Sequence, residues 1–405
     1  MNDVRISDDT KRQFKFSEII ILIIITLLIG FILGLSIFKV MHEKEDSNIA
    51  STDEYISKFV DNYNYIVDNY YGDLDKEKLI DEAIAGMINS VDDPYTSYID
   101  GDNSNVFNTT LDGSFQGIGV EVANDSDNNI VVHGIISDSP AEKAGIKVGD
   151  IFKSINNQSV EDMSTKEFVS IIKTSDSSNF EIVVLRDGQE VKLNVERELV
   201  TIKSVVSEIF ERDGKKIGYL YMSIFANNTY SQFKSKLLEL EEKGIDSLII
   251  DVRSNTGGHL TTVENILSLF LDSSHVIYQT EDKNGIVKSY SHGSVTKNYP
   301  IVILTNEASA SASEILAAAM SEEYGAILVG KRTYGKGTVQ ELKTLSDGQQ
   351  YKFTTKKWLT PKGNWIHEVG IAVDIDVDFN KDYYDNPVYE NDQQLQTAIE
   401  ALLKK

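Results

Sequence analysis

A run of twenty residues without a charge, Ile19 to Phe38, constrains this 405-residue chain more than any other feature. At about 1.5 Å of rise per residue, a helix of this length spans about 30 Å, the thickness of the hydrocarbon core of a bilayer. Buried helices of globular domains seldom run so far with so few polar residues. We therefore expect a transmembrane helix over 19–38, which separates a short N-terminal tail, 1–18, from the bulk of the chain.

The flanks of this run predict its orientation. Basic residues are slightly more numerous before it than after it: Arg5, Lys11, Arg12 and Lys15 precede it, and Lys39, Lys44 and Lys58 follow. By the positive-inside rule, the tail 1–18 is cytoplasmic and the bulk of the chain lies outside the cytoplasm. The run is long for a secretory signal, and no small-x-small cleavage site precedes the acidic stretch 43–46. We expect an uncleaved, single-pass anchor in the cell membrane.

Charge and composition exclude several classes of protein. Asp and Glu number 63 against 39 Lys and Arg, a net charge of −24, whereas nucleic-acid binding needs a basic face. The chain has no cysteine, which removes disulfides, thiolate nucleophiles and thiolate zinc sites. It has six histidines and no HExxH motif. We expect no nucleic-acid partner, no metal and no organic cofactor.

The segment 41–105 reads as a linker followed by a helical region. Residues 41–52 are polar, and apolar residues then recur at helical spacing from Tyr55 to Val91, with a break at Gly72–Asp73. This pattern predicts a hairpin of two amphipathic helices. Its apolar stripe needs a partner, either the rest of its own domain or a second copy in a homodimer. The sequence leaves both alternatives open.

The remainder divides into two regions of different pattern. Residues 106–198 contain five short β-like runs and one helical segment, 165–173, which indicates a compact β-rich module. The runs are 119–122, 130–136, 150–155, 180–185 and 190–195. From 199 to 405, apolar strands alternate with helices, which predicts a layered α/β core with β-rich insertions at 278–291 and 340–357. The fold class is therefore α+β and multidomain.

Two motifs in the β-rich module suggest how it binds. Residues 115–120 read FQGIGV and residues 139–150 read SPAEKAGIKVGD. A glycine-rich loop leaves backbone N–H groups free for a carboxylate, and the strand that follows can pair with an extended peptide. The two motifs together resemble a PDZ domain of the bacterial protease type, over 106–198. The resemblance implies that Gly117, Ile118, Gly119 and Val120 line a groove for protein C-termini with apolar side chains.

Three segments of the last region carry candidate chemistry. They read DVRSNTGG at 251–258, NEASASASEI at 306–315 and GKRTYGKGTVQ at 330–340. A serine between a buried strand and a helix lies beside free backbone N–H groups, which suits a nucleophile in acyl transfer, although helix capping is the plainer explanation. The candidate nucleophiles of this segment are Ser309, Ser311 and Ser313. A serine also needs an adjacent base to attack at neutral pH.

The third segment has part of a phosphate-loop pattern. Gly330 and Gly335-Lys336 have the spacing of GxxxxGK[ST], but Gly337 stands where Ser or Thr would bind magnesium, so we exclude nucleotide binding. Lys336, between two glycines, is on a backbone that can approach another group closely. Burial would lower its pKa toward the range of a general base.

Together with DPYTSY at 93–98 and the PDZ-like module, these segments resemble the carboxyl-terminal processing peptidases, or tail-specific proteases, over about 55–405. The resemblance implies a ClpP/crotonase-like core and a serine–lysine endopeptidase that recognises the C-terminal tails of proteins. Ser311 matches the family's nucleophile, Lys336 its general base and Gln340 the glutamine that orients the lysine. Backbone N–H groups of Gly257 or Gly258, and of Ala312, match its oxyanion donors.

Two rival hypotheses remain. A serine–histidine–aspartate triad would use one of His259, His292 and His367. A catalytically silent scaffold would use only the PDZ domain to tether partners, but the serine, the lysine and the glutamine are all present here. In some family members a basic residue of the PDZ helix couples peptide binding to activation, and Lys173 lies at about that place. We expect the PDZ domain to block the site until a tail binds.

Overall fold

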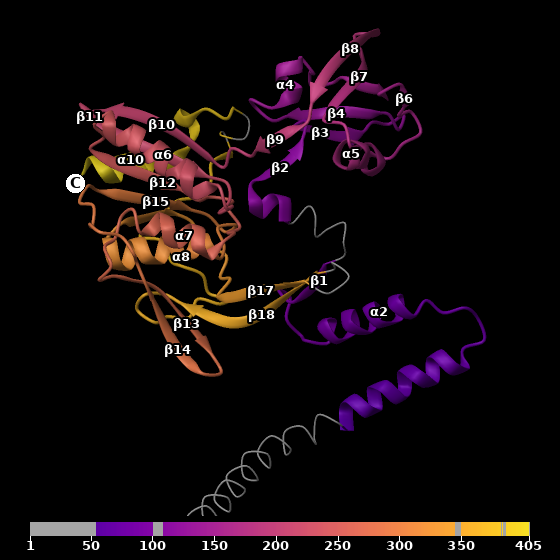
Figure 1. The fold of residues 1–405 in the computed structure, drawn as a ribbon. Helices are drawn as coiled ribbons and strands as arrows, with labels where there is room; N and C mark the ends of the chain where they lie inside the picture. The colour runs from indigo at the N-terminus through magenta and orange to yellow at the C-terminus, as the bar shows by residue number, and fades with distance from the viewer. Residues whose placement is uncertain (1–53, 100–107, 345–349, 382, 384–385, 405) are drawn as a thin grey trace, which may run out of the picture. The chain divides into compact units, whose positions relative to one another are not determined.

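A computed structural model describes residues 54–99, 108–344, 350–381, 383 and 386–404 (Figure 1). The predicted tail 1–18 and transmembrane helix 19–38 lie outside these residues. Within the described ranges, no helix has the length and apolar character to cross a bilayer. The chain divides into two units, residues 1–87 and 88–405, which are described separately.

The first unit contains the first of the two predicted helices and most of the second. One helix covers residues 54–69 and the second, α2, covers Lys76–Asn89, so the break falls where the sequence places it. The Asp75 carboxylate accepts hydrogen bonds from the amides of Glu77 and Lys78 at 3.1 Å each, which explains the start of α2. Many of the large apolar side chains are exposed: Tyr55, Ile56, Phe59, Val60, Tyr65, Ile66, Tyr70, Tyr71 and Met87.

The β-rich module forms a sheet of order β3-β4-β5-β7-β8 that closes over two helices. Its strands are β3 (Val120–Asn124), β4 (Ile130–Ile135), β5 (Ile151–Ile155), β6 (Gln158–Ser159), β7 (Asn179–Arg186) and β8 (Gln189–Glu196). The helices are α4 (Pro140–Ala144) and α5 (Thr165–Thr174). Alternate residues of β7 are buried, and Phe152 packs on Phe168 of α5 with ring centroids 4.5 Å apart. The five expected strands and the expected helix are confirmed.

A central six-stranded sheet, ordered β10-β11-β12-β15-β16-β19, organises the rest of the second unit. Its strands are β10 (Val205–Arg212), β11 (Lys215–Met222), β12 (Ser247–Asp251), β15 (Ile301–Thr305), β16 (Ile327–Gly330) and β19 (Ile375–Asp376). All neighbouring strands are parallel except β10 and β11. Every residue of β12 and β15 is buried, because helices cover both faces of the sheet.

The alternation of side chains along β12 assigns the helices to the two faces. Leu248 and Ile250 pack with α6 (Thr229–Glu242), α7 (Leu260–Leu267) and α8 (Ala312–Ala319). Ile249 packs on the opposite face with α10 (Gln393–Leu403). The layered α/β core expected from the sequence is therefore present.

A second sheet carries the β-rich insertions, in the order β1-β18-β13-β14 with β17 also paired to β18 (Figure 1). Its strands are β1 (Ser97–Ile99), β13 (Val276–Asp282), β14 (Gly285–Tyr290), β17 (Thr338–Thr344) and β18 (Gln350–Leu359). β1, which lies far away in sequence, pairs antiparallel with β18. The segment before β1 therefore lies beside the strands that follow Lys336.

Some boundaries differ from the sequence-based expectation. The sequence pattern predicts a helix over 260–270, but α7 ends at Leu267; it also predicts one over 313–323, where α8 is followed by a π-helical turn, Met320–Tyr324. Further features were not predicted, among them the pair of β2 (Ser114–Gly117) with β9 (Glu198–Thr201), the edge strand β10, and α10. β10 mixes charged and apolar residues, since it lies at the edge of the sheet.

Candidate active site

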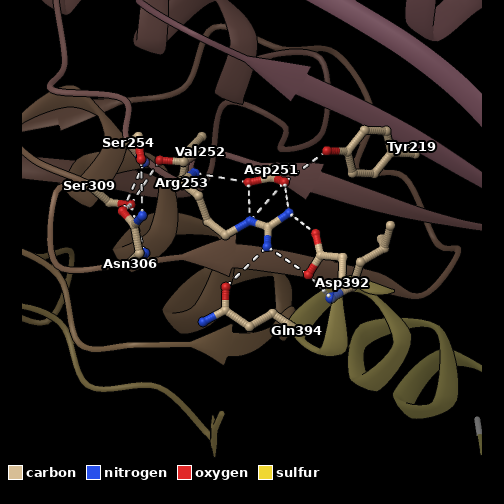
Figure 2. A network of polar contacts seen from close by, with 10 residues as sticks. Tyr219, Asp251, Val252, Arg253, Ser254, Asn306, Ser309, Asp392 and Gln394 are labelled. Atoms are coloured by element: carbon tan, nitrogen blue, oxygen red, sulfur yellow. Dashed lines mark hydrogen bonds and ion pairs between the residues drawn. The ribbon is translucent and has the colours of Figure 1, made fainter. Parts of the chain in front are cut away.

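The loops that follow β12 and β15 are held side by side (Figure 2). The Ser254 amide donates to Asn306 Oδ1 at 2.8 Å, and Asn306 Nδ2 donates back to Ser254 Oγ at 3.1 Å. The Ser309 hydroxyl donates to the carbonyl of Val252 at 2.8 Å. These contacts place the glycine pair 257–258, from one loop, next to Ser311, from the other.

Asn255 of the DVRSNTGG motif also holds the loops after β12 and β15 together, from a buried position. Its fully buried side chain donates to the Met222 carbonyl at 3.0 Å and accepts from the Gly257 amide at 2.9 Å. Its own carbonyl accepts from the Ala310 amide at 3.1 Å and from the Ser313 hydroxyl at 2.8 Å. An asparagine is required because the position needs a donor and an acceptor together.

The aspartate and the arginine of the motif form an ion network at the end of β12 (Figure 2). Arg253 pairs with Asp251 at 2.6 Å and with Asp392 at 2.7 Å, and both carboxylates are buried. These two carboxylates raise the pKa of Arg253 although burial acts against it. Asp392 is also the N-cap of α10, so the network ties that helix to the strand before the glycine pair.

Ser311 has an unusual backbone conformation at the start of α8. Its φ is 55° and its ψ is −113°, which is costly for a residue other than glycine. Ser309 and Ser313 are fully buried, and each donates its hydroxyl proton to a backbone carbonyl. Ser311 is half-buried. These contacts favour Ser311 over its two neighbours as a nucleophile.

The glycine pair approaches Ser311 closely. A methyl group added at Gly257 would lie 2.9 Å from Ser311 Cβ and 3.1 Å from the Ala312 amide nitrogen, so only glycine fits there. The Gly257 amide is used by Asn255, which makes Gly258 the better oxyanion donor of the pair. Ala312 is the first residue of α8, where an amide has no partner within the helix.

Glu314 joins the serine loop to the lysine loop. Its fully buried carboxylate accepts from the Thr333 hydroxyl at 2.6 Å and from the Gly335 amide at 2.7 Å through Oε1. Through Oε2 it accepts from the Ser311 amide at 2.8 Å and from the Lys336 amide at 2.9 Å. The backbones of Ser311 and Lys336 are thus bound to one oxygen atom.

The two tryptophans of the chain hold the other side of the lysine loop. The indole N–H of Trp358 donates to the Lys336 carbonyl at 2.6 Å, and that of Trp365 donates to the Gly337 carbonyl at 2.9 Å. The Gly335 carbonyl accepts from the Glu368 amide at 2.8 Å. The peptide groups around Lys336 are therefore fixed before any substrate binds.

The Lys336 amine lies in a partly desolvated environment. Burial lowers the pKa of Lys336 below its usual 10.5, and the Lys352 cation lowers it further, while Glu314 and Asp93 oppose this. Its Nζ lies 5.1 Å from the centroid of the Tyr95 ring. A lowered pKa increases the neutral fraction of the amine at neutral pH, as a general base requires.

Gln340 lies on β17, opposite Thr354 of β18. Its Nε2 donates to the hydroxyls of Thr338 at 2.9 Å and Thr354 at 3.2 Å. These bonds fix the amide plane four residues after Lys336.

Among the described residues, no hydrogen bond joins Ser311 to any of the three candidate histidines, His259, His292 and His367. The two ring nitrogens of His292 contact Ser268 and Asn265. His259 Nε2 and His367 Nδ1 are buried with no hydrogen-bond partner among the residues that the structure describes. A triad needs a histidine bonded to the serine, so this geometry does not favour one. In the same described ranges, no three His, Asp or Glu side chains gather as metal ligands would.

In the β-rich module, the four groove candidates lie where β2 ends and the edge strand β3 begins, since Gly117 is the last residue of β2 and Val120 the first of β3. Ile118 is buried and belongs to the same apolar core as Phe168 and Ile172 of α5. Gly119 has a φ of 83°, and a methyl group there would lie 2.2 Å from Ser139 Cβ. Val120 packs partly on the same core. The free edge of β3 has the arrangement that strand addition by a peptide needs.

Comparisons with known proteins show the family of this chain. The model of peptidase family S41 matches residues 216–377, that of the activating protease CtpB N-terminal domain matches 36–103, and that of the PDZ domain matches 131–186. The carboxy-terminal processing protease CtpB of Bacillus subtilis (strain 168) is 38% identical over 325 residues, covering 80% of this chain and 68% of that protein. The chain belongs to the carboxy-terminal processing proteases of family S41.

Other S41 proteins extend the comparison. The carboxy-terminal processing protease CtpA of the same organism is 35% identical over 389 residues, covering 95% of this chain and 81% of that protein. A crystal structure of a Bacteroides fragilis protein, assigned to the S41 proteases, covers 83% of this chain and 92% of its own with a TM-score of 0.50 and 16% identity, a likeness of fold alone. This S41 protein is a serine-type peptidase with a PDZ domain.

Sequence reasoning misses three parts of the site. Glu314 has a signal, because serine at 311 with glutamate at 314 is the pattern of a capping box, but this pattern does not predict its bonds to the lysine loop. Trp358 and Trp365 give no local signal, because their partners are backbone carbonyls on another segment. Tyr95 belongs to the DPYTSY motif, which by itself assigns it no role.

Proposed function

We propose that this S41 protease is an endopeptidase that cleaves with a Ser311–Lys336 dyad. The observation that carries the proposal is the shared Glu314 oxygen, which binds the amides of both residues. The left-handed backbone of Ser311 and the lowered pKa of Lys336 support it further. Since no cofactor is part of this chemistry, the chain's own residues supply every step.

In the proposed mechanism, Ser311 Oγ bonds to the carbonyl carbon of the scissile peptide and its proton passes to neutral Lys336 Nζ. The carbonyl π electrons move to oxygen, and the amides of Gly258 and Ala312 bind the oxyanion. The C–N bond then breaks, and Lys336 returns the proton to the leaving amine. Water then loses a proton to Lys336 and bonds to the acyl carbon, the bond between that carbon and Ser311 Oγ breaks, and Lys336 returns the proton to Oγ.

Gln340 assists by orienting Lys336 in this proposal. Its amide nitrogen is held by two threonine hydroxyls, so its carbonyl oxygen has a restricted set of directions. A hydrogen bond from the lysine amine to that oxygen during the reaction would fix the amine toward Ser311. The restriction of the amide plane supports this role.

Substrate tails dock on the PDZ domain in this proposal. The carboxylate binds the amides of Gly117, Ile118, Gly119 and Val120, and an apolar terminal side chain enters beside Ile118. The docked tail brings the rest of a protein substrate to the protease core. Release of a PDZ block on binding, with Lys173 as the coupling residue, completes the proposed cycle.

The dyad is tested by single substitutions in the full chain. Ser311→Ala and Lys336→Ala should each lower kcat for an unfolded protein substrate with an apolar C-terminus by about 10⁴-fold or more, because both steps need both groups. The matched control is Ser235→Ala, an exposed serine of α6 whose hydroxyl bonds the Glu239 carboxylate. It should keep both its kcat and its stability. Full activity of Ser311→Ala would refute the dyad, and tail binding without cleavage by the wild type would favour a scaffold.

We propose in addition that residues 19–38 anchor the protein in the cell membrane, with the protease outside the cytoplasm. Support comes from the uncharged run and its basic N-terminal flank. The protein should remain in the membrane pellet after carbonate extraction and should be digested by protease added outside intact cells. Recovery of the full chain in the soluble fraction would contradict this.

A further inference from the structure

The segment Asp93–Thr96, part of the DPYTSY motif, forms a tight turn against the lysine loop. The Asp93 carboxylate accepts from the Tyr95 amide at 3.0 Å and from the Thr96 hydroxyl at 2.7 Å. Buried Thr96 in turn accepts from the Thr354 amide of β18 at 3.1 Å. The turn is therefore fixed to the strand that pairs with Gln340.

This anchoring directs the Tyr95 ring at the Lys336 amine. The Nζ lies 5.1 Å from the ring centroid, within the roughly 6 Å over which an aromatic face attracts a cation. The Tyr95 ring also contacts the ring of His367, in an edge-on arrangement with centroids 6.0 Å apart. His367 itself stacks on Trp365, whose indole holds the Gly337 carbonyl.

The phenol stays neutral, so the interaction is one of ring face and cation rather than of two charges. Burial and a hydrogen bond with the Tyr334 side chain raise the pKa of Tyr95 to about 12. Lys336 also feels fixed charges from several elements, and the ring acts in addition to them. These charged residues are Asp93 of the turn, Glu314 of α8 and Lys352 of β18.

We propose that Tyr95 is a positioning residue for Lys336, whose aromatic face stabilises the ammonium formed when the lysine takes the proton of Ser311. An aromatic face interacts more strongly with an ammonium than with a neutral amine. The gain therefore appears as charge develops on Nζ, which lowers the barrier instead of only strengthening ground-state binding. This inference rests on the proposed role of Lys336 as general base.

The test changes the electron density of the aromatic ring at position 95 while the size of the ring stays nearly constant. In the full-length protein, Tyr95→Phe is the reference, and phenylalanines with one, two or three ring fluorines replace it at the same position. Each fluorine weakens the negative potential of the face, which makes the ammonium less favourable. We measure kcat and the acid limb of kcat/KM against pH for peptide cleavage, and the melting temperature.

Tyr95→Phe should behave nearly as the wild type. Across the fluorinated series the plateau kcat should fall progressively, by about 2- to 30-fold in total. The acid limb should move to lower pH by about 0.4 to 1.5 units, because a less stabilised ammonium loses its proton more easily. The same replacements at Tyr290, an exposed residue of β14, should change neither quantity.

Three results would overturn the inference. The first is a series with unchanged kcat and acid limb. The second is a loss in Tyr95→Phe as large as in the fluorinated variants, which would assign the role to the hydroxyl. The third is a changed melting temperature with the acid limb in place, which would indicate a merely structural role. Activity of Lys336→Ala would refute the dyad itself, so the two failures are distinguishable.

Discussion

At the scale of single residues, Glu314 explains how a serine and a lysine that are far apart in sequence come to be held together. Its carboxylate accepts four hydrogen bonds, from Ser311, Thr333, Gly335 and Lys336. A carboxylate suits this place because it only accepts. The strained backbone of Ser311 is tolerated because Glu314 and Asn255 both bind the loop that carries it.

Glu314→Gln is therefore expected to damage both stability and catalysis. The amide would turn an NH₂ group toward backbone donors, which should lower the free energy of unfolding by about 2–4 kcal/mol. Small displacements of the serine and the lysine should lower kcat by about a hundredfold with a smaller change in KM. Chemical denaturation and steady-state kinetics measure the two effects, with Glu242→Gln, exposed at the end of α6, as the control. A variant with normal kcat would show that the shared oxygen does not position the dyad.

At the scale of elements, the site depends on loops at the carboxyl ends of parallel strands, each fixed by a helix or by a neighbouring loop. The network of Arg253 with Asp251 and Asp392 links α10 to the strand that precedes the glycine pair (Figure 2). Removing only the carboxylate of a buried ion pair is strongly destabilising, because the guanidinium is then left partly unpaired. α10 thus supports the loop of the glycine pair 257–258 from the opposite face of the sheet.

Asp392→Asn separates the charge of this network from helix capping. The asparagine can still accept from the Leu395 amide, which Asp392 now does at 3.0 Å, but it no longer balances Arg253. We expect the free energy of unfolding to fall by about 3–5 kcal/mol, with kcat largely retained in the folded protein. Thermal and urea denaturation of the two proteins at neutral pH provide the measurement. A stability equal to that of the wild type would mean that the network does not hold α10.

At the scale of the whole molecule, much of the architecture follows from the sequence. Buried strands such as β15 read as uninterrupted apolar runs, and the glycine and serine motifs follow these strands directly. What could not be predicted are contacts between distant segments. Tyr95 reaches Lys336 only because β1 pairs with β18, and Asp392 reaches Arg253 only because α10 covers the sheet. Such pairings leave no periodic signal in either segment.

We also expect the charge of the substrate's C-terminus to change the rate at which a distant peptide bond is cleaved. A substrate with an amidated C-terminus should be cut with a kcat/KM at least about tenfold lower than the same substrate with a free carboxylate, because the amides near Gly119 favour an anion. Competition by a short peptide with a free apolar C-terminus, compared with its amidated form, checks the assignment. Equal cleavage of both substrates would exclude tail recognition by the PDZ domain.

The most direct test of Ser311 as the nucleophile is to find which residue forms a covalent bond with a substrate-like inhibitor. The full-length protein is incubated with a peptidyl phosphonate that carries a free apolar C-terminal tail, digested with trypsin and analysed by tandem mass spectrometry. We expect one adduct, on Ser311. Its rate of formation should fall by orders of magnitude in Lys336→Ala. An adduct on Ser309 or Ser313, or equally fast labelling without the lysine, would contradict it.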